Sequence, residues 1–130
     1  MILRLCAFPW ARDYLITKLP SDLVLLGPRS LVVELLNGMW QKAQERKEIT
    51  INERAIFHIA CSDSARAAYE SVELVCEAAG TSVNFKAHPL ERIARDVKVI
   101  RQHVTVASHH IEDGGRVLLG LPPNGIMLKS

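Results

Sequence analysis

The chain has 130 residues, of which 48% are hydrophobic and 23% charged, and its basic and acidic side chains leave a formal net charge of +2. This length allows one hydrophobic core and excludes the two or three domains that most cofactor-dependent enzymes need. The composition is that of a globular domain, and the small net charge excludes the strong field that draws proteins to nucleic acid or anionic lipid. We therefore expect one folded domain that binds neither nucleic acid nor membranes.

The cysteines and the first residues indicate an intracellular protein. Cys6, Cys61 and Cys76 form no Cys-x-x-Cys pair, so the sequence predicts neither a disulfide framework nor a thiolate zinc site. Pro9, Arg12 and further charged residues interrupt any signal-peptide core, and no apolar run approaches the roughly 20 residues needed to cross a bilayer. We expect a soluble, cytoplasmic chain.

The first helix is expected after an irregular N-terminal segment, residues 1–27, which contains two prolines and at most short helices. Pro28 suits the first turn of a helix, and apolar residues then recur at three- and four-residue spacing. These residues are Leu31, Val32, Leu35, Leu36, Met39 and Ala43. The pattern predicts a helix over residues 28–47.

A second helix is expected to begin after Thr50. Thr50 and Glu53 have the spacing of a capping box, in which each side chain satisfies a backbone amide of the first turn. No proline or glycine follows until Gly80, which is a typical helix stop. Such a helix is about 40 Å long. One of its faces carries mostly small side chains, namely Ile56, Ala60, Ser64, Ala67, Ser71 and Val75, so a neighbouring helix or a ligand can approach closely.

A third long helix is expected from Pro89 to near Gly114, because apolar residues recur at helical spacing from Leu90 to Ile111. A second stripe on this helix mixes charge, imidazole and valine, which indicates a partner surface or a wall of a site. Its members are Arg92, Asp96, Val99, His103, Val106 and His110. The fold class predicted from these patterns is an all-α, up-and-down bundle of three long helices, with no strand.

Histidines and carboxylates near the C-terminus do not have the spacing of a metal site. Neither His109 nor His110 has a glutamate three residues before it, as inward-facing Glu-x-x-His pairs of helical bundles require. We expect no bound metal. From spacing alone, His103 can be either a structural histidine or a catalytic one. Likewise, Arg95 and Asp96 read as a structural ion pair, and the residues at Gly80 as a helix C-cap.

Four segments together resemble the C-terminal helical domain of the acyl-CoA dehydrogenase superfamily. They are Ala78-Ala79-Gly80, His88-Pro89-Leu90-Glu91-Arg92-Ile93-Ala94-Arg95-Asp96, His103, and Leu118-Leu119-Gly120-Leu121. The resemblance covers about residues 28–121, with residues 1–27 as an N-terminal segment and 122–130 as a tail. In that superfamily the flavin lies between domains and subunits. The N-terminal helical and middle β-domains are not found here, so we expect a fragment or a truncated gene product that is not active alone.

Departures from the dehydrogenase motifs favour one branch of the superfamily. Cys76 and Ala79 replace the glutamine and first glycine of Gln-x-x-Gly-Gly. Where many dehydrogenases have Tyr-Glu-Gly-Thr, with the glutamate as base, this chain has residues 103–106, and Val104 cannot act as a base. A histidine seven residues after the Arg-Asp pair resembles instead the two-component flavin-dependent monooxygenases, and His103 falls on their histidine.

This resemblance implies a function. A separate flavin reductase would supply reduced FMN or FAD, and oxygen would be transferred to an aromatic or heteroaromatic substrate. The resemblance makes His103 the catalytic candidate, since an imidazole exchanges protons near neutral pH, and it makes Gly80, Thr81 and Ser82 flavin contacts. The alternatives are a domain of a true acyl-CoA dehydrogenase and a non-catalytic helical oligomerisation module. Because an isolated bundle exposes apolar surface, we also expect a homodimer or homotetramer.

Overall fold

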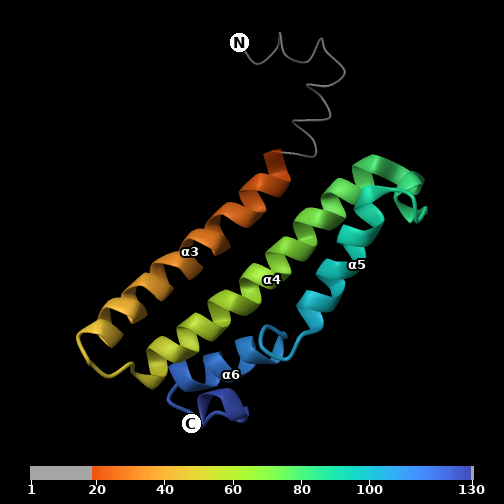
Figure 1. The fold of residues 1–130 in the computed structure, drawn as a ribbon. Coiled ribbons are helices and arrows are strands. Elements are labelled where there is room, and N and C mark those ends of the chain that lie inside the picture. Colours follow the sequence, from red (N-terminus) through yellow and green to blue (C-terminus); the bar gives the residue numbers. More distant parts are fainter. Residues whose placement is uncertain (1–18, 130) are drawn as a thin grey trace.

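The computed structural model describes residues 19–129, with side chains from Val24 onward (Figure 1). These residues form four α-helices: α3 (Leu19–Gln44), α4 (Ile51–Ala79), α5 (Pro89–Gln102) and α6 (His109–Leu118). Two short 3₁₀ segments, η2 (Gly80–Asn84) and η3 (Ile126–Leu128), complete the described elements. Residues 19–129 contain no strand, which confirms the predicted all-α class.

Helix α4 is the central element of the fold. It contacts α3, α5 and α6, and Figure 1 shows it between α3 and α5, which run antiparallel to it. Its 29 residues make it about 43 Å long. Helix α6 packs near the N-terminal end of α4, beside the chain's C-terminus. None of the helices within residues 19–129 combines the length and the apolar content needed to cross a bilayer.

Helix α3 begins earlier than predicted. It starts at Leu19, so residues 19–27 are helical rather than irregular, and Pro28 lies inside the helix instead of at its start. Pro20 explains the difference, because a proline in the first turn has no intrahelical N–H bond to lose. The part of the N-terminal prediction that concerns residues 1–18 lies outside the described residues.

Helix α3 ends in a Schellman motif. The N–H of Lys47 donates to the carbonyl of Lys42, and the N–H of Arg46 donates to that of Ala43. Arg46 has a φ of 55°, a left-handed conformation that glycine adopts more readily than arginine. The chain reverses direction here and enters α4 within six residues, 45–50.

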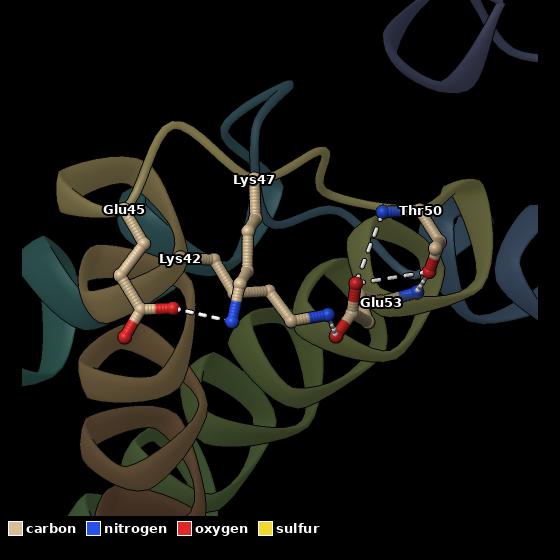
Figure 2. A network of polar contacts seen from close by, with 5 residues as sticks. All are labelled: Lys42, Glu45, Lys47, Thr50 and Glu53. Carbon is tan, nitrogen blue, oxygen red and sulfur yellow. Dashed lines mark hydrogen bonds and ion pairs between the residues drawn. The ribbon is translucent and has the colours of Figure 1, made fainter.

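The predicted capping box at the start of α4 is confirmed. The Glu53 amide donates to the Thr50 hydroxyl oxygen at 3.3 Å, and the Thr50 amide donates to the Glu53 carboxylate at 3.0 Å. Figure 2 shows that Lys42 reaches across from α3 to the same carboxylate, while Lys47 pairs with Glu45 at 2.6 Å. The bond from Lys42 and the two bonds from Thr50 lower the pKa of Glu53 to about 2, against a small opposing effect of burial. One carboxylate thus caps α4 and ties it to α3.

The predicted third helix is wrong in one respect, because the structure has two helices with a break between them. Helix α5 ends at Gln102, and α6 begins at His109. The break contains three successive β-branched residues, Val104, Thr105 and Val106, which lose side-chain freedom in a helix. In addition, the Thr105 amide donates to the His103 ring, which gives the backbone an alternative to helical bonding.

The break also divides the mixed stripe that the sequence placed on one helix face. Val99 and His103 are exposed, as predicted for a partner surface, but His110 lies beyond the break and is only 1% exposed. A side chain predicted to face a partner therefore belongs to the interior.

Small residues form the core. The buried side chains of α4 are Ala55, Ala60, Ser62, Ala65, Ala67 and Ser71. Of the small-residue face predicted from the sequence, Ala60, Ala67 and Ser71 are buried, whereas Ile56 is exposed. Ala55 packs with Val117 of α6 and Leu128 of η3, so the C-terminal residues return to the core. Burial raises the pKa of Asp113, but N–H donors from Gly125 and Asn124 lower it more, so the carboxylate stays ionised and holds this tail.

Candidate functional site

The turn after α4 contains the three predicted flavin contacts. Gly80 ends the helix, and its N–H donates to the carbonyls of Cys76 and Glu77. Its φ of 66° lies in the region that favours glycine, so the backbone alone accounts for this residue type. Thr81 and Ser82 are exposed, and the Ser82 hydroxyl donates to the carbonyl of Ala79 at 2.8 Å.

A surface pocket of about 400 Å³ lies between this turn and α5, and we name it the Gly80 pocket. Its lining residues come from α4, η2 and α5: Glu73, Cys76, Glu77, Gly80, Thr81, Val83, Asn84, Ala94 and Lys98. Gly80 and Thr81 therefore line it together, whereas Ser82 does not. A Cβ placed on Gly80 would meet nothing within 4 Å, which leaves the backbone there open to a ligand.

Cys76 is unsuited to nucleophilic chemistry. Burial and the Glu73 carboxylate raise the pKa of its thiol, outweighing the effect of Lys98, so the sulfur stays protonated at neutral pH. Burial also raises the pKa of Cys61. Cys6 lies outside the described residues.

His103 lies at the other end of α5. It is the C-cap residue of that helix and is exposed. Its Nδ1 lies 2.8 Å from the Thr105 hydroxyl oxygen and accepts a long bond, 3.4 Å, from the Thr105 amide. A neutral imidazole held in this way carries its proton on Nε2. His103 does not line the Gly80 pocket, so the structure does not bring the predicted catalytic residue and the predicted flavin contacts together in one pocket.

A second pocket, of about 560 Å³, lies between α4 and the C-terminal half of α5. Its lining residues are Tyr69, Lys98, Arg101, Gln102, Ala107 and Ser108, and we name it the basic pocket. Lys98 lines both pockets, so it joins them along α5. Sequence reasoning missed this site. The three-residue spacing of Lys98 and Arg101 places both on one helix face, but nothing in the sequence brings Tyr69 or Ser108 to them.

Two histidines of α6, His109 and His110, and one of α4, His58, pack with one another. The ring centroids of His110 and His58 are 5.2 Å apart, and those of His110 and His109 are 4.2 Å apart. The Nε2 of His110 lies 2.6 Å from the carbonyl oxygen of Val104, so this nitrogen carries the proton. Within residues 19–129, no three histidine, cysteine, aspartate or glutamate side chains are grouped so as to hold a metal ion.

The sequence that forms this fold matches a known protein family. Residues 25–108, more than half of the chain, match the family model described as acyl-CoA dehydrogenase, C-terminal domain. The chain belongs to this family. No curated protein and no solved structure was found to match it.

Membership in the acyl-CoA dehydrogenase C-terminal domain family confirms the superfamily that the sequence motifs indicated, and that family is flavin-dependent. The matched region includes α4, α5, the Gly80 pocket and the loop with His103. The two pockets and the exposed imidazole therefore lie within or at the edge of the part of the chain that the family shares.

Proposed function

We propose that the chain is the C-terminal domain of the oxygenase component of a two-component, flavin-dependent monooxygenase acting on an aromatic or heteroaromatic substrate. The observation that carries the proposal is the α5–α6 loop, where an exposed imidazole is followed by Val104, Thr105 and Val106. Residues 103–108 contain no carboxylate that could remove a proton from an acyl chain, whereas the imidazole of His103 is a side chain of the kind used in general acid–base catalysis. The domain predicted over residues 28–121 is extended in this proposal to include the start of α3 at Leu19 and the tail as far as Leu128, which packs in the core.

The Gly80 pocket supports a flavin site by its open backbone at Gly80 and Thr81 and by a volume within the range of small-molecule sites. Its lining has one cation, Lys98, and two carboxylates, Glu73 and Glu77. Reduced FMN or FAD, supplied by a separate reductase, would provide the redox chemistry when bound. We include Ser82 as a backbone contact only, because its hydroxyl already donates to Ala79.

His103 would hold or donate a proton at Nε2. Thr105 fixes the ring through Nδ1, which leaves the Nε2–H as the group that a ligand at the loop can accept from. An exposed position in an isolated domain agrees with a site completed by other domains or subunits. We further propose a cytoplasmic location, in keeping with unpaired cysteines at Cys61 and Cys76.

Homo-oligomerisation is the third part of the proposal. Helix α3 exposes Leu26, Leu31, Val33, Leu36 and Trp40. A groove on α3 is lined by Leu26, Arg29, Ser30, Val33, Glu34, Asn37, Gly38 and Gln41. These positions are symmetric about the centre of the set, so an antiparallel second copy would place each against another member, with Arg29 opposite position 38 and Val33 opposite position 34 of the second copy. We expect a dimer by light scattering, and a Val33→Glu monomer.

Anaerobic titration of reduced FMN and FAD onto the full chain tests the flavin site. We expect saturable binding that Thr81→Trp weakens and His103→Ala leaves unchanged. In a full-length enzyme that contains this domain, with a reductase and oxygen present, His103→Ala should instead change the rate of peroxide release. If an acyl-CoA binds and competes with the aromatic substrate, the acyl-CoA dehydrogenase alternative is favoured. If no flavin binds, the non-catalytic oligomerisation module is favoured.

A further inference from the structure

The basic pocket has an excess of positive charge that the known fold does not explain. Lys98 and Arg101 line it, and none of its six lining residues is acidic. Lys98 does face one carboxylate, that of Glu73, but the N···O separation is 3.7 Å and both side chains are well exposed. Exposed pairs of this kind contribute little and are screened by salt, so Lys98 remains available to a stronger anion.

Arg101 is held in a position suited to anion binding. Its guanidinium carbon lies 4.7 Å from the centre of the Tyr69 ring, within the range of cation–π contacts. Stacking uses the flat face of the guanidinium and leaves its N–H donors free at the edge, where they can bind an oxyanion in a fork. Among residues 19–129, no carboxylate forms an ion pair with Arg101.

Ser108 adds a neutral donor to the lining of the pocket. It is the N-cap residue of α6, and its hydroxyl makes no capping bond. The partial positive charge at the start of α6 adds to the field of the two cations. The pocket thus offers a point charge, a planar fork and a hydroxyl, which together can donate to several oxygens of one oxyanion such as phosphate.

We propose that the basic pocket binds the phosphate group of an organic phosphate. The phosphate is held between Lys98 and Arg101, and the volume of about 560 Å³ leaves room for part of the organic group. That group can extend along Lys98 toward the Gly80 pocket, because this side chain lines both. The charge and geometry of the pocket carry this assignment whether or not the proposed flavin site is correct. FMN is one source of such a phosphate, and a phosphorylated substrate is another.

Amide NMR of the full chain, titrated with inorganic phosphate at constant ionic strength, tests the pocket directly. Saturable shifts at the Ala107 and Ser108 amides are expected. Lys98→Gln and Arg101→Gln should each raise the phosphate dissociation constant about tenfold, the effect of one charge-assisted bond. Arg92→Gln is the matched control, since Arg92 also lies on α5 and is exposed, but pairs with Asp96 and does not line the pocket. An equal loss in this control, or shifts that never saturate, would overturn the proposal.

Comparison of FMN with riboflavin identifies the source of the phosphate. Tighter binding of FMN, with the difference abolished by Arg101→Gln, supports the proposal and assigns the phosphate to the flavin. Equal binding of FMN and riboflavin, together with saturable binding of inorganic phosphate, supports it with a phosphorylated substrate as the source. Binding of riboflavin without any binding of phosphate refutes the basic pocket while leaving the proposed function intact. Binding of phosphate without either flavin leaves the pocket intact and refutes the flavin site.

Discussion

Gly114 and Gly115 form a matched pair that tests how closely α6 approaches α4. A Cβ added to Gly114 would lie 2.6 Å from Cγ1 of Ile59, 2.8 Å from its Cδ1 and 3.1 Å from the carbonyl oxygen of Ala55. A Cβ added to Gly115 would meet nothing within 4 Å. Carbon atoms prefer separations of about 3.5–4.0 Å, so an alanine at position 114 requires the Ile59 side chain to move. The Ala55 carbonyl oxygen belongs to the backbone of α4 and cannot move away as easily.

The changes in the free energy of unfolding caused by Gly114→Ala and Gly115→Ala should therefore differ in sign or size. Alanine in place of a helical glycine contributes about 1 kcal/mol of stability, which we expect for Gly115→Ala. Overpacking costs about 1–3 kcal/mol, so Gly114→Ala should have a free energy of unfolding lower than that of Gly115→Ala by about this amount. Urea unfolding followed by circular dichroism measures both, provided that the m-values agree.

A double-mutant cycle with Ile59→Ala identifies the contact itself. Truncating Ile59 removes the two atoms nearest to the added methyl group, so Gly114→Ala should become nearly as favourable as Gly115→Ala in that background. Our account of the α4–α6 contact is refuted if Gly114→Ala is already as stable as Gly115→Ala with Ile59 in place.

Four further predictions concern the turn between α3 and α4 and the partly buried environment of His58. Thr50→Ala should cost about 1 kcal/mol by removing the α4 cap, measured by urea unfolding, and a change under a few tenths would contradict the capping box. The lowered pKa of Glu53, about 2, means that its contribution is present above pH 4.5 and is lost as the pH falls toward 2, so Glu53→Gln should flatten stability over that interval. Burial, His110 and Arg54 lower the pKa of His58, against an opposing effect of Asp113; stability should therefore fall as the pH drops below 6.5, and His58→Gln should reduce that slope. Arg46→Gly should relieve a left-handed residue and raise the free energy of unfolding by about 0.5–1 kcal/mol, and with it the thermal midpoint, whereas a lower midpoint would show that Arg46 is not strained.

Local signals predicted those parts of the fold where one residue type has one structural use. Thr50 and Glu53 marked the start of α4, Gly80 its end and Pro89 the start of α5, as the structure confirms. Pro28 misled because a proline can begin a helix or be tolerated within one, and Pro20 offered an equally good start. Only packing against α4 decides between them.

The break after α5 was hidden by periodicity. The apolar spacing continues through residues 103–108, so the pattern gave no warning, and only the run of β-branched residues at Val104–Val106 could have indicated it. The basic pocket could not be predicted from the sequence, for a different reason. Tyr69 and Ser108 lie on different elements from Lys98 and Arg101, and no spacing rule joins residues that only the tertiary fold brings together.

The break between α5 and α6 gives two histidines of the same predicted stripe opposite environments. In one continuous helix, His103 and His110 would be seven residues apart on a single face. Instead, the loop leaves His103 exposed and turns His110 inward against His58, where its Nε2 donates to Val104, the residue next to His103. The buried histidine thereby ties down the loop that carries the exposed one. The same loop supplies Ala107 and Ser108 to the basic pocket. The α5–α6 loop, held by the His110 imidazole, therefore positions both His103 and part of the lining of the proposed phosphate site.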